Sequence, residues 1–392
     1  MREDWEYKTF GEIGSFLRGK NIQKADFVSG GLPCIHYGQI HTKFDISIDY
    51  HLSEIPQEVY DKAIIASPGD VIIAITSEDI DGSCKSVVWL GNYDIAVSAH
   101  AAILKHNMNG KFIAYYLRSN TFFTQKLKYA RGFKVMEIKT KDLAKLVLPI
   151  PPKPTQLSIV SELDKLNELI RIKKEQLKDY DALAQSIFYE MFGDPVVNEK
   201  GWEVKKLMEV CDVRDGTHDS PKYVESSNYM LITSKNIVNR AISFDDVNYI
   251  TEEDYNNINK RSKVDNGDIL MPMIGTIGNP VIVYLDNLHK FSIKNVALIK
   301  FLHNTSILNR YLLELMISES FRRYLLSLNK GGTQKFVALG TIRRMDIILP
   351  PLPLQQSFAQ KIEQIEQQKA AIQKTITDLE TLLAARMQYW FD

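Results

Sequence analysis

The chain has 392 residues, of which 45% are apolar and 24% charged, and its 48 Lys plus Arg balance 48 Asp plus Glu. This length can fill two or three cores, and a formal net charge of zero excludes a global attraction to polyanions, so any nucleic-acid surface must be local. The three cysteines lie in no metal or redox spacing and no stretch approaches 18 apolar residues, which predicts a cytoplasmic protein with no membrane partner.

The N-terminal part of the chain predicts a domain of mixed helix and strand. It opens with Trp5-Glu6-Tyr7-Lys8, and short β-branched runs at 63–65 and 71–75 are separated by turn residues. A buried strand at 101–104 and an aromatic helix at 112–127 follow. Because strand signals are many and short while helical signals are few, we expect an α+β domain.

A long helix is predicted next, at 163–191. Apolar residues recur there at alternating steps of three and four, which is the a/d seam of a heptad, and Gly193-Asp194-Pro195 ends the helix. A second such stretch lies 199 residues further on, at 362–390. We therefore predict two helices that pack on each other through their seams, where Lys173 and Lys369 either fix the register or mark a docking site for a partner. The predicted seam residues are Leu163, Leu166, Ile170, Leu177 and Ile187 in the first helix and Ile362, Ile365, Ile372, Ile376 and Leu379 in the second.

The rest of the chain repeats as well. Trp202-Glu203-Val204-Lys205 matches the opening, and Asn266-Gly267-Asp268 matches Pro68-Gly69-Asp70. We therefore predict one structural unit used twice. The predicted segments are a first globular domain at 1–152, a first spacer helix at 153–195, a second globular domain at 196–351 and a second spacer helix at 352–392.

No motif assigns a reaction to this chain. Gly275-Thr276-Ile277-Gly278 is too short for a nucleotide-binding loop and lacks its lysine, and Asn279-Pro280-Val281-Ile282 lacks the second proline and the aromatic ring of an amino-methyltransferase motif. His36, His41 and His51 have no helical i, i+4 pairing. We expect no catalytic residue, no metal and no cofactor in the chain itself.

Basic residues gather beside a glycine loop in each half. Residues 118–145 hold eight basic side chains against two acidic ones, and residues 319–346 hold six against two. Such loops let backbone and side chains approach phosphates, so we predict phosphate contacts, with a solvated charged face as the alternative. The residues predicted to contact phosphates are Arg131, Lys134, Lys330 and Lys335.

The polar loops between the shared landmarks differ. The segment 18–27 bears no resemblance to Asp215-Gly216-Thr217-His218-Asp219-Ser220-Pro221, and 77–85 differs from 274–278. A common frame with divergent loops predicts two sites of one kind that recognise different things. As a set, side chains there suit hydrogen bonding to base edges in the major groove, although each one alone fits an ordinary loop surface. The residues predicted to contact bases are Arg18, Lys20, Asn21, Tyr37, Gln39 and Lys85 in the first half and Thr217, His218, Lys222, Lys235, Asn236 and Gln334 in the second.

The tandem halves, the openings at Trp5 and Trp202, the proline-rich strand exits and the loop 215–221 together resemble the specificity subunit of type I restriction-modification systems. The resemblance covers the whole chain. It implies two target-recognition domains in tandem, joined by two long helices packed as an antiparallel coiled coil. Each domain would read one part of a bipartite DNA target, with the helix pair setting the gap, and the divergent loops make that target asymmetric.

The same resemblance implies the partners. They would be double-stranded DNA, two methyltransferase (modification) subunits and two motor-nuclease (restriction) subunits, with S-adenosylmethionine, ATP and magnesium bound by those subunits. Two alternatives stay open from the sequence. One is a self-contained nuclease or methyltransferase, and the other is a coiled-coil scaffold that binds protein or glycan.

Overall fold

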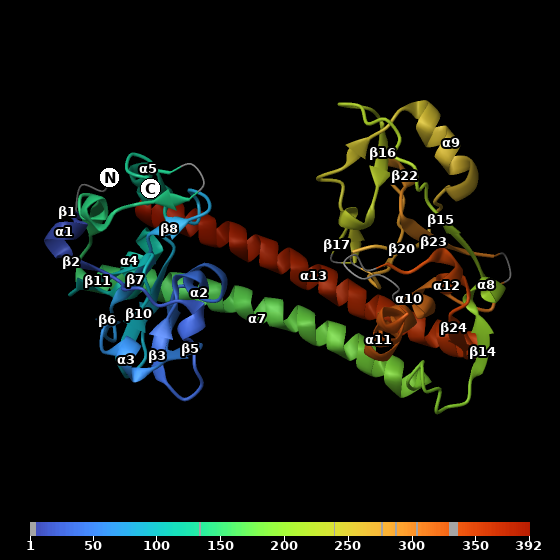
Figure 1. Ribbon diagram of the computed structural model, residues 1–392, viewed down its shortest axis with the longest axis horizontal. Helices are drawn as coiled ribbons and strands as arrows, with labels where there is room; N and C mark the ends of the chain where they lie inside the picture. The colour runs from blue at the N-terminus through green and yellow to red at the C-terminus, as the bar shows by residue number, and fades with distance from the viewer. Residues whose placement is uncertain are drawn as a thin grey trace. The chain divides into compact units, whose positions relative to one another are not determined.

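A computed structural model describes residues 5–132, 135–238, 240–275, 277–286, 288–302, 305–328 and 336–392 (Figure 1). The chain forms two compact units. The first unit comprises residues 1–174 and 374–392, and the second comprises residues 175–373. Each unit therefore combines the globular part of one half of the sequence with a portion of both long helices.

The first unit is built on two sheets. One has the strand order β2 (Gly14–Arg18), β11 (Ala101–His106), β7 (Val71–Ala74), β9 (Ser86–Trp89), β4 (Ser47–Ile48), and the other has the order β5 (Ser53–Ile55), β3 (Leu32–Ile35), β10 (Ile95–Val97), β6 (Ile64–Ala66). Two small sheets pair β1 (Glu6–Thr9) with β13 (Val147–Ile150) and β8 (Thr76–Ser77) with β12 (Met136–Glu137). The short helices are α1 (Phe10–Ile13), η1 (Lys24–Asp26), α2 (Tyr37–Thr42), α3 (Gln57–Tyr60), α4 (Gly110–Tyr116), α5 (Asn120–Lys126) and α6 (Thr140–Leu143).

Strand β7 shows why a fully apolar run forms the centre of a sheet here. All four of its residues are buried. Because successive side chains of a strand point to opposite faces, Val71 and Ile73 join the core that contains α4, whereas Ile72 and Ala74 join the core that contains Trp89. The sheet thus separates two hydrophobic cores.

The second unit repeats this plan. One sheet has the order β15 (Cys211–Asp215), β23 (Val296–Phe301), β20 (Ile269–Pro272), β21 (Val281–Ile282), and another the order β19 (Asn248–Tyr249), β16 (Tyr229–Ile232), β22 (Lys290–Ile293). Small sheets pair β14 (Glu203–Lys206) with β24 (Asp346–Leu349) and β17 (Ile237–Val238) with β18 (Ala241–Ile242). The short helices are α8 (Leu207–Val210), η2 (Ser234–Asn236), α9 (Glu252–Ser262), α10 (Asn309–Ile317), α11 (Glu319–Ser327) and α12 (Leu339–Arg343).

One ion pair recurs at the matching turn of both units. Lys105 Nζ lies 2.5 Å from Asp70 Oδ2, and Lys300 Nζ lies 2.6 Å from Asp268 Oδ2. In each case the lysine belongs to the strand beside the Gly-Asp turn that precedes β7 or β20. The predicted duplication of an α+β unit is confirmed at the level of single contacts.

The predicted aromatic helix at 112–127 is wrong as a single helix, and so is the single helix that the repeat predicts at 307–326. Each is interrupted by a serine, at 119 and at 318. Ser119 Oγ accepts a hydrogen bond from Phe122 N at 3.1 Å and so begins a new helix, α5. Serine favours this capping position over a helix interior, which explains the break.

The long helices α7 (Lys153–Phe192) and α13 (Leu352–Phe391) pack together in antiparallel fashion (Figure 1). In the first unit, Trp390 Nε1 and Arg386 Nη2 lie 3.0 Å and 3.1 Å from Glu162 Oε2. In the second unit, Lys369 Nζ lies 2.9 Å from Asp181 Oδ1. Early residues of one helix therefore face late residues of the other. No helix of the described ranges has the length and apolar character needed to cross a membrane.

Most of the predicted seam is buried. The buried members are Leu163, Leu166, Ile170, Ile362, Ile365, Ile372 and Ile376, whereas Leu177, Ile187 and Leu379 are half-buried. Near the end of α7 the buried residues are Ala184, Phe188 and Phe192, at steps of four. The heptad prediction fails there because α7 turns this face to the core of the second unit, where Phe192 meets Tyr311 with ring centroids 4.8 Å apart.

Candidate nucleic-acid interface

The end of β2 positions the first group of predicted contact residues. Arg18 closes the strand and Lys20 forms a bridge to Ser98. Gly19, between them, packs so closely against the segment around Ser98 that a Cβ atom would lie 2.1 Å from Ser98 O. Only glycine fits this close approach. The flanking residues Arg18, Lys20 and Asn21 are exposed on the surface of the first unit.

Tyr37 contacts the same residue, Ser98, as Lys20 does. Its backbone N donates to Ser98 Oγ at 2.9 Å, and its ring lies 5.1 Å from that of His100. Lys85 Nζ donates to His41 O at 2.8 Å, and the His41 ring lies 6.3 Å from the Tyr37 ring. Ser98 thus links Lys20 to Tyr37, and helix α2 links Tyr37 to Lys85.

Arg18 and Arg131 meet at Glu137. Arg18 Nη2 lies 3.2 Å from Glu137 Oε1, and the backbone of Arg131 pairs with that of Glu137. About half of the Arg18 side chain is exposed, and an exposed pair of this kind contributes little to stability. The Arg18 guanidinium can therefore turn to a phosphate, and Arg131 is exposed beside it. The predicted contacts Lys134, Lys330, Gln334 and Lys335 lie outside the described residues.

Two predicted base-contacting residues have amide groups that are hydrogen-bonded within the protein. Gln39 Oε1 accepts from His36 N at 2.9 Å, and its Nε2 donates to Ser53 Oγ at 2.7 Å. Asn236 does the same in the second unit, accepting from Thr233 N at 3.0 Å and donating to Asp246 O at 2.8 Å, and its side chain is buried. Both amides are occupied in capping a short helix and holding the following segment.

In the second unit the loop after β15 is held by a buried carboxylate. Asp215 Oδ2 lies 2.7 Å from His218 Nε2, and its Oδ1 pairs with the Arg261 guanidinium. His218 Nδ1 lies 2.9 Å from Asn295 Oδ1. Hydrogen bonds to Asn295 and to Asp215 raise the pKa of His218 above its usual value. Both ring nitrogens of His218 are thus engaged within the protein in this conformation.

The remaining predicted residues of this unit lie at its surface. Thr217 follows Gly216, whose Cβ would lie 2.1 Å from Ile293 O, the same close approach as at Gly19. Lys222 is exposed, and Lys235 pairs with Asp246 at 3.0 Å. Thr217 and His218 share one loop.

Sequence reasoning missed a pair of equivalent residues, His100 and Asn295. Each directly precedes an inner strand of its sheet, β11 or β23, and each has a left-handed backbone, with φ of 68° and 53°. His100 contacts Tyr37 and Asn295 contacts His218, so the matching position touches the variable loop in both units. Non-glycine residues in this conformation cluster at functional sites. Asparagine tolerates a left-handed backbone better than most residues, so the asparagine at 295 is the one feature of the sequence that points to this position.

Residues 2–179 and 199–381 match the sequence family of the type I restriction modification DNA specificity domain. The chain belongs to this family. Two copies of its domain therefore lie in tandem, as the internal repeat indicates. Members of this specificity family are non-catalytic, which confirms the expectation that the chain is not an enzyme.

Relatives in this specificity family match nearly the whole chain. The MjaVIII specificity subunit of Methanocaldococcus jannaschii is 22% identical over 388 residues, covering 93% of this chain and 86% of the relative. The EcoKI specificity subunit of Escherichia coli strain K12 is 21% identical over 416 residues, covering 96% and 85%.

Two solved structures have the same fold. A type I restriction-modification S subunit from M. genitalium matches with a TM-score of 0.54 at 12% identity, covering 99% of this chain and 96% of that chain. A structure from work on assembly and conformational transition of the type I R-M system matches with a TM-score of 0.60 at 18% identity, covering 100% and 98%. The family match, the relatives and these structures together confirm the predicted resemblance to type I restriction-modification specificity subunits.

Proposed function

We propose that the chain is the DNA-reading subunit of a type I restriction-modification complex, and that its two units read the two parts of an asymmetric, bipartite target in double-stranded DNA. The observation that carries this proposal is that the two units have the same backbone arrangement at one position but different side chains there. At one backbone position, beside a closely packed glycine, the first unit presents Arg18-Gly19-Lys20-Asn21 and the second presents Asp215-Gly216-Thr217-His218. Different hydrogen-bonding groups on one frame suit different base sequences.

The helix pair is the proposed spacer between the two half-sites. Cross-helix ion pairs at Arg386 and at Lys369 support this role, because each fixes the register of α7 and α13 within its own unit. A fixed register suits a spacer of constant length.

The proposed assembly contains two methyltransferase subunits and two motor-nuclease subunits. S-adenosylmethionine, ATP and magnesium would be bound by those partners, with none held by this chain. The half-buried and exposed apolar residues along the helices, such as Leu169 and Leu382, suit contacts with such partners.

Mapping the methylated sites in cells that carry this chain with its methyltransferase partner tests the proposal. We expect one sequence with two specific parts, of different sequence, separated by a gap of constant length. A continuous target, or methylation without sequence preference, would contradict it.

A further inference from the structure

In the first unit, two backbone hydrogen bonds fix the turn that carries His100 into strand β11. Gly19 N donates to Ala101 O at 2.9 Å, and Lys20 N donates to Val97 O at 3.2 Å. The two bonds flank His100 in the chain. They hold its turn directly against the end of β2, where the exposed residues predicted to contact DNA begin.

The second unit holds the turn before β23 with the same two bonds. Gly216 N donates to Val296 O at 3.1 Å, and Thr217 N donates to Ile293 O at 3.0 Å. This turn carries Asn295 at the position directly before the strand. The two units therefore share the backbone arrangement here, and one presents an imidazole where the other presents an amide.

Both residues have a backbone conformation that favours glycine. The φ angle is 68° at His100 and 53° at Asn295. A Cβ atom makes this left-handed conformation costly, and glycine adopts it without that cost. A turn that needed only this backbone shape would therefore favour glycine. Because both units instead carry a polar side chain, we look for the function of these positions in the side chains.

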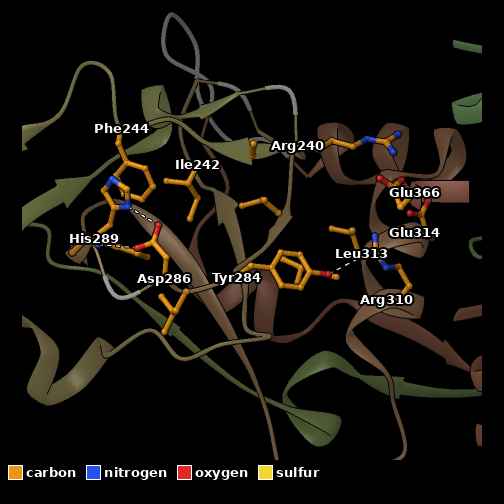
Figure 2. A pocket seen from close by; sticks show the side chains of 15 residues that line it. Arg240, Ile242, Phe244, Tyr284, Asp286, His289, Arg310, Leu313, Glu314 and Glu366 are labelled. Atoms are coloured by element: carbon orange, nitrogen blue, oxygen red, sulfur yellow. Dashed lines mark hydrogen bonds and ion pairs between the residues drawn. The ribbon is translucent and has the colours of Figure 1, made fainter. Parts of the chain in front are cut away.

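The other non-glycine residues of left-handed backbone have side chains with a structural role. Among the described residues these are Cys84, Asn198 and Arg240. Cys84 is buried in the core of the first unit. The Asn198 amide accepts from Trp202 N at 2.9 Å and donates to Trp202 O at 2.9 Å. Arg240 lines a cavity of the second unit (Figure 2) and pairs with Asp181 at 3.3 Å.

His100 and Asn295 instead lie against residues predicted to contact bases. The exposed His100 ring lies 5.1 Å from the Tyr37 ring, and its nitrogens form no hydrogen bond with any described residue. Asn295 is half-buried, and its Oδ1 lies 2.9 Å from His218 Nδ1. The Asn295 Nδ2 group has no hydrogen-bond partner in the described part of the chain. Each position thus offers an unused hydrogen-bonding group at the candidate interface.

These unused groups suit the edges of bases. An amide N–H or an imidazole N–H can donate to the N7 acceptor that every purine presents in the major groove. The two groups differ in size and in the direction of their donors. The same backbone position therefore suits different base pairs in the two units.

We propose that His100 and Asn295 are specificity-determining residues, and that each contacts one base pair of the half-site that its own unit reads. The inference rests on the proposed function. It adds the turns before β11 and β23 to the surface that reads DNA. Each turn would then contribute one base contact to its half-site.

Mapping of methylated sites in cells that carry the full chain with its methyltransferase partner tests this assignment. His100→Gly keeps the left-handed backbone and removes only the side chain. We expect the preference at one base pair of one half-site to fall by about tenfold or more, while the other half-site and the gap stay the same. Asn295→Gly should have the same effect on one base pair of the other half-site.

Two conservative variants provide a readout that a purely structural role would not change. His100→Asn and Asn295→Asp introduce residues that tolerate the left-handed backbone and can still form hydrogen bonds. Each should replace the preferred base at the affected position rather than remove the preference. These variants also decide the matter if a glycine variant does not accumulate. Asn198→Gly, at a left-handed position whose amide is bonded to Trp202, is the matched control and should keep the target unchanged.

A glycine variant that methylates the unaltered target with unchanged selectivity overturns the assignment for its unit. Uniformly weaker methylation with all base preferences kept would also overturn it, because that result shows a structural role. The unaltered chain is mapped in parallel, which separates the two failures. A bipartite target that the variants leave unchanged refutes these base contacts alone, whereas a target that is not bipartite in the unaltered chain refutes the proposed function and this inference with it.

Discussion

Lys369 of α13 forms an ion pair with Asp181 of α7, with Nζ 2.9 Å from Oδ1 and only 18% of the lysine side chain exposed. Asp181 also lies 3.3 Å from Arg240 Nη1, so one carboxylate joins both long helices to the turn between β17 and β18. A charged residue in an apolar seam is costly unless it is paired. The pair explains why a lysine is tolerated at a heptad position.

Removing this pair should destabilise the second unit modestly. Because nearly half of Asp181 is exposed, we expect Lys369→Ala to lower the free energy of unfolding by about 1 kcal/mol. A double-mutant cycle with Asp181→Ala, measured by urea unfolding, isolates the pairwise contribution. Lys374→Ala, at an exposed position of the same helix, is the control. A coupling energy of zero would show that the ion pair does not fix the register.

The Glu162 contact should make the first unit sensitive to acid. Hydrogen bonds from Arg386 and from Trp390 hold the pKa of Glu162 below its ordinary value of 4.5. A group whose pKa is lowered by folding contributes stability above its unfolded pKa, and this contribution is lost as the pH falls through the folded pKa. We therefore expect Glu162→Gln to be less stable than the unaltered chain at pH 6 and to lose less stability below pH 4.5. Identical pH profiles for the two proteins would contradict this assignment.

His218 should titrate at a higher pH than a free histidine. Its hydrogen bonds to Asn295 and Asp215 raise its pKa above 6.5, so its contribution to loop stability is present below pH 6.5 and is lost as the pH rises through the raised pKa. NMR titration of the His218 ring measures this directly. Asn295→Ala should move the pKa of His218 down, whereas Lys222→Ala in the same loop should not. A pKa of His218 at or below 6.5 in the unaltered chain would exclude the described geometry.

Arg131 is expected to contact phosphate rather than bases. Arg131→Ala should weaken binding to all DNA sequences by a similar factor and reduce the slope of log K against log salt by about one unit. Fluorescence anisotropy with the target and with unrelated duplexes, over a range of salt concentrations, provides the measurement. Lys62→Ala, at an exposed site in the first unit, is the control. An unchanged salt slope would count against the phosphate contact.

Lengthening the helix pair should change the spacing of the target. Seven extra residues inserted after Lys174 and again after Gln373 preserve the heptad phase and add about 10 Å at about 1.5 Å per residue. We expect the gap between the half-sites to lengthen while both half-sites keep their sequence, as judged by methylation mapping. An unchanged gap would remove the helix pair from the role of spacer.

The sequence predicted the parts of the fold that depend on local pattern. The seam from Leu163 to Ile170 and its copy at Ile362 follow from heptad spacing, and the duplication follows from repeated landmarks such as Gly69-Asp70 and Gly267-Asp268. Helix breaks at Ser119 and Ser318 were not predicted. The Ser119 hydroxyl caps α5, whereas the Ser318 hydroxyl donates to Leu315 O of the preceding helix, and neither role of a serine is visible before the backbone is known.

The candidate interface was predicted less completely. Lys20 and Tyr37 both contact Ser98, and Lys85 contacts His41. The sequence placed these residues in loops, whereas Tyr37 begins helix α2. Gln39 and Asn236 have side chains that can read adenine, yet nothing in sequence distinguishes an amide that caps a helix from one that projects to solvent. Arg261 lies 46 residues from Asp215 in the chain, and only the tertiary fold brings them together.

Each unit is proposed to read its own part of the target. Exchanging residues 208–340 for the matching segment of another specificity subunit, followed by mapping of methylated sites with the same methyltransferase partner, tests it most directly. We predict that one part of the recognised sequence changes while the other part and the gap stay the same. A change in both parts, or in neither, would contradict the account.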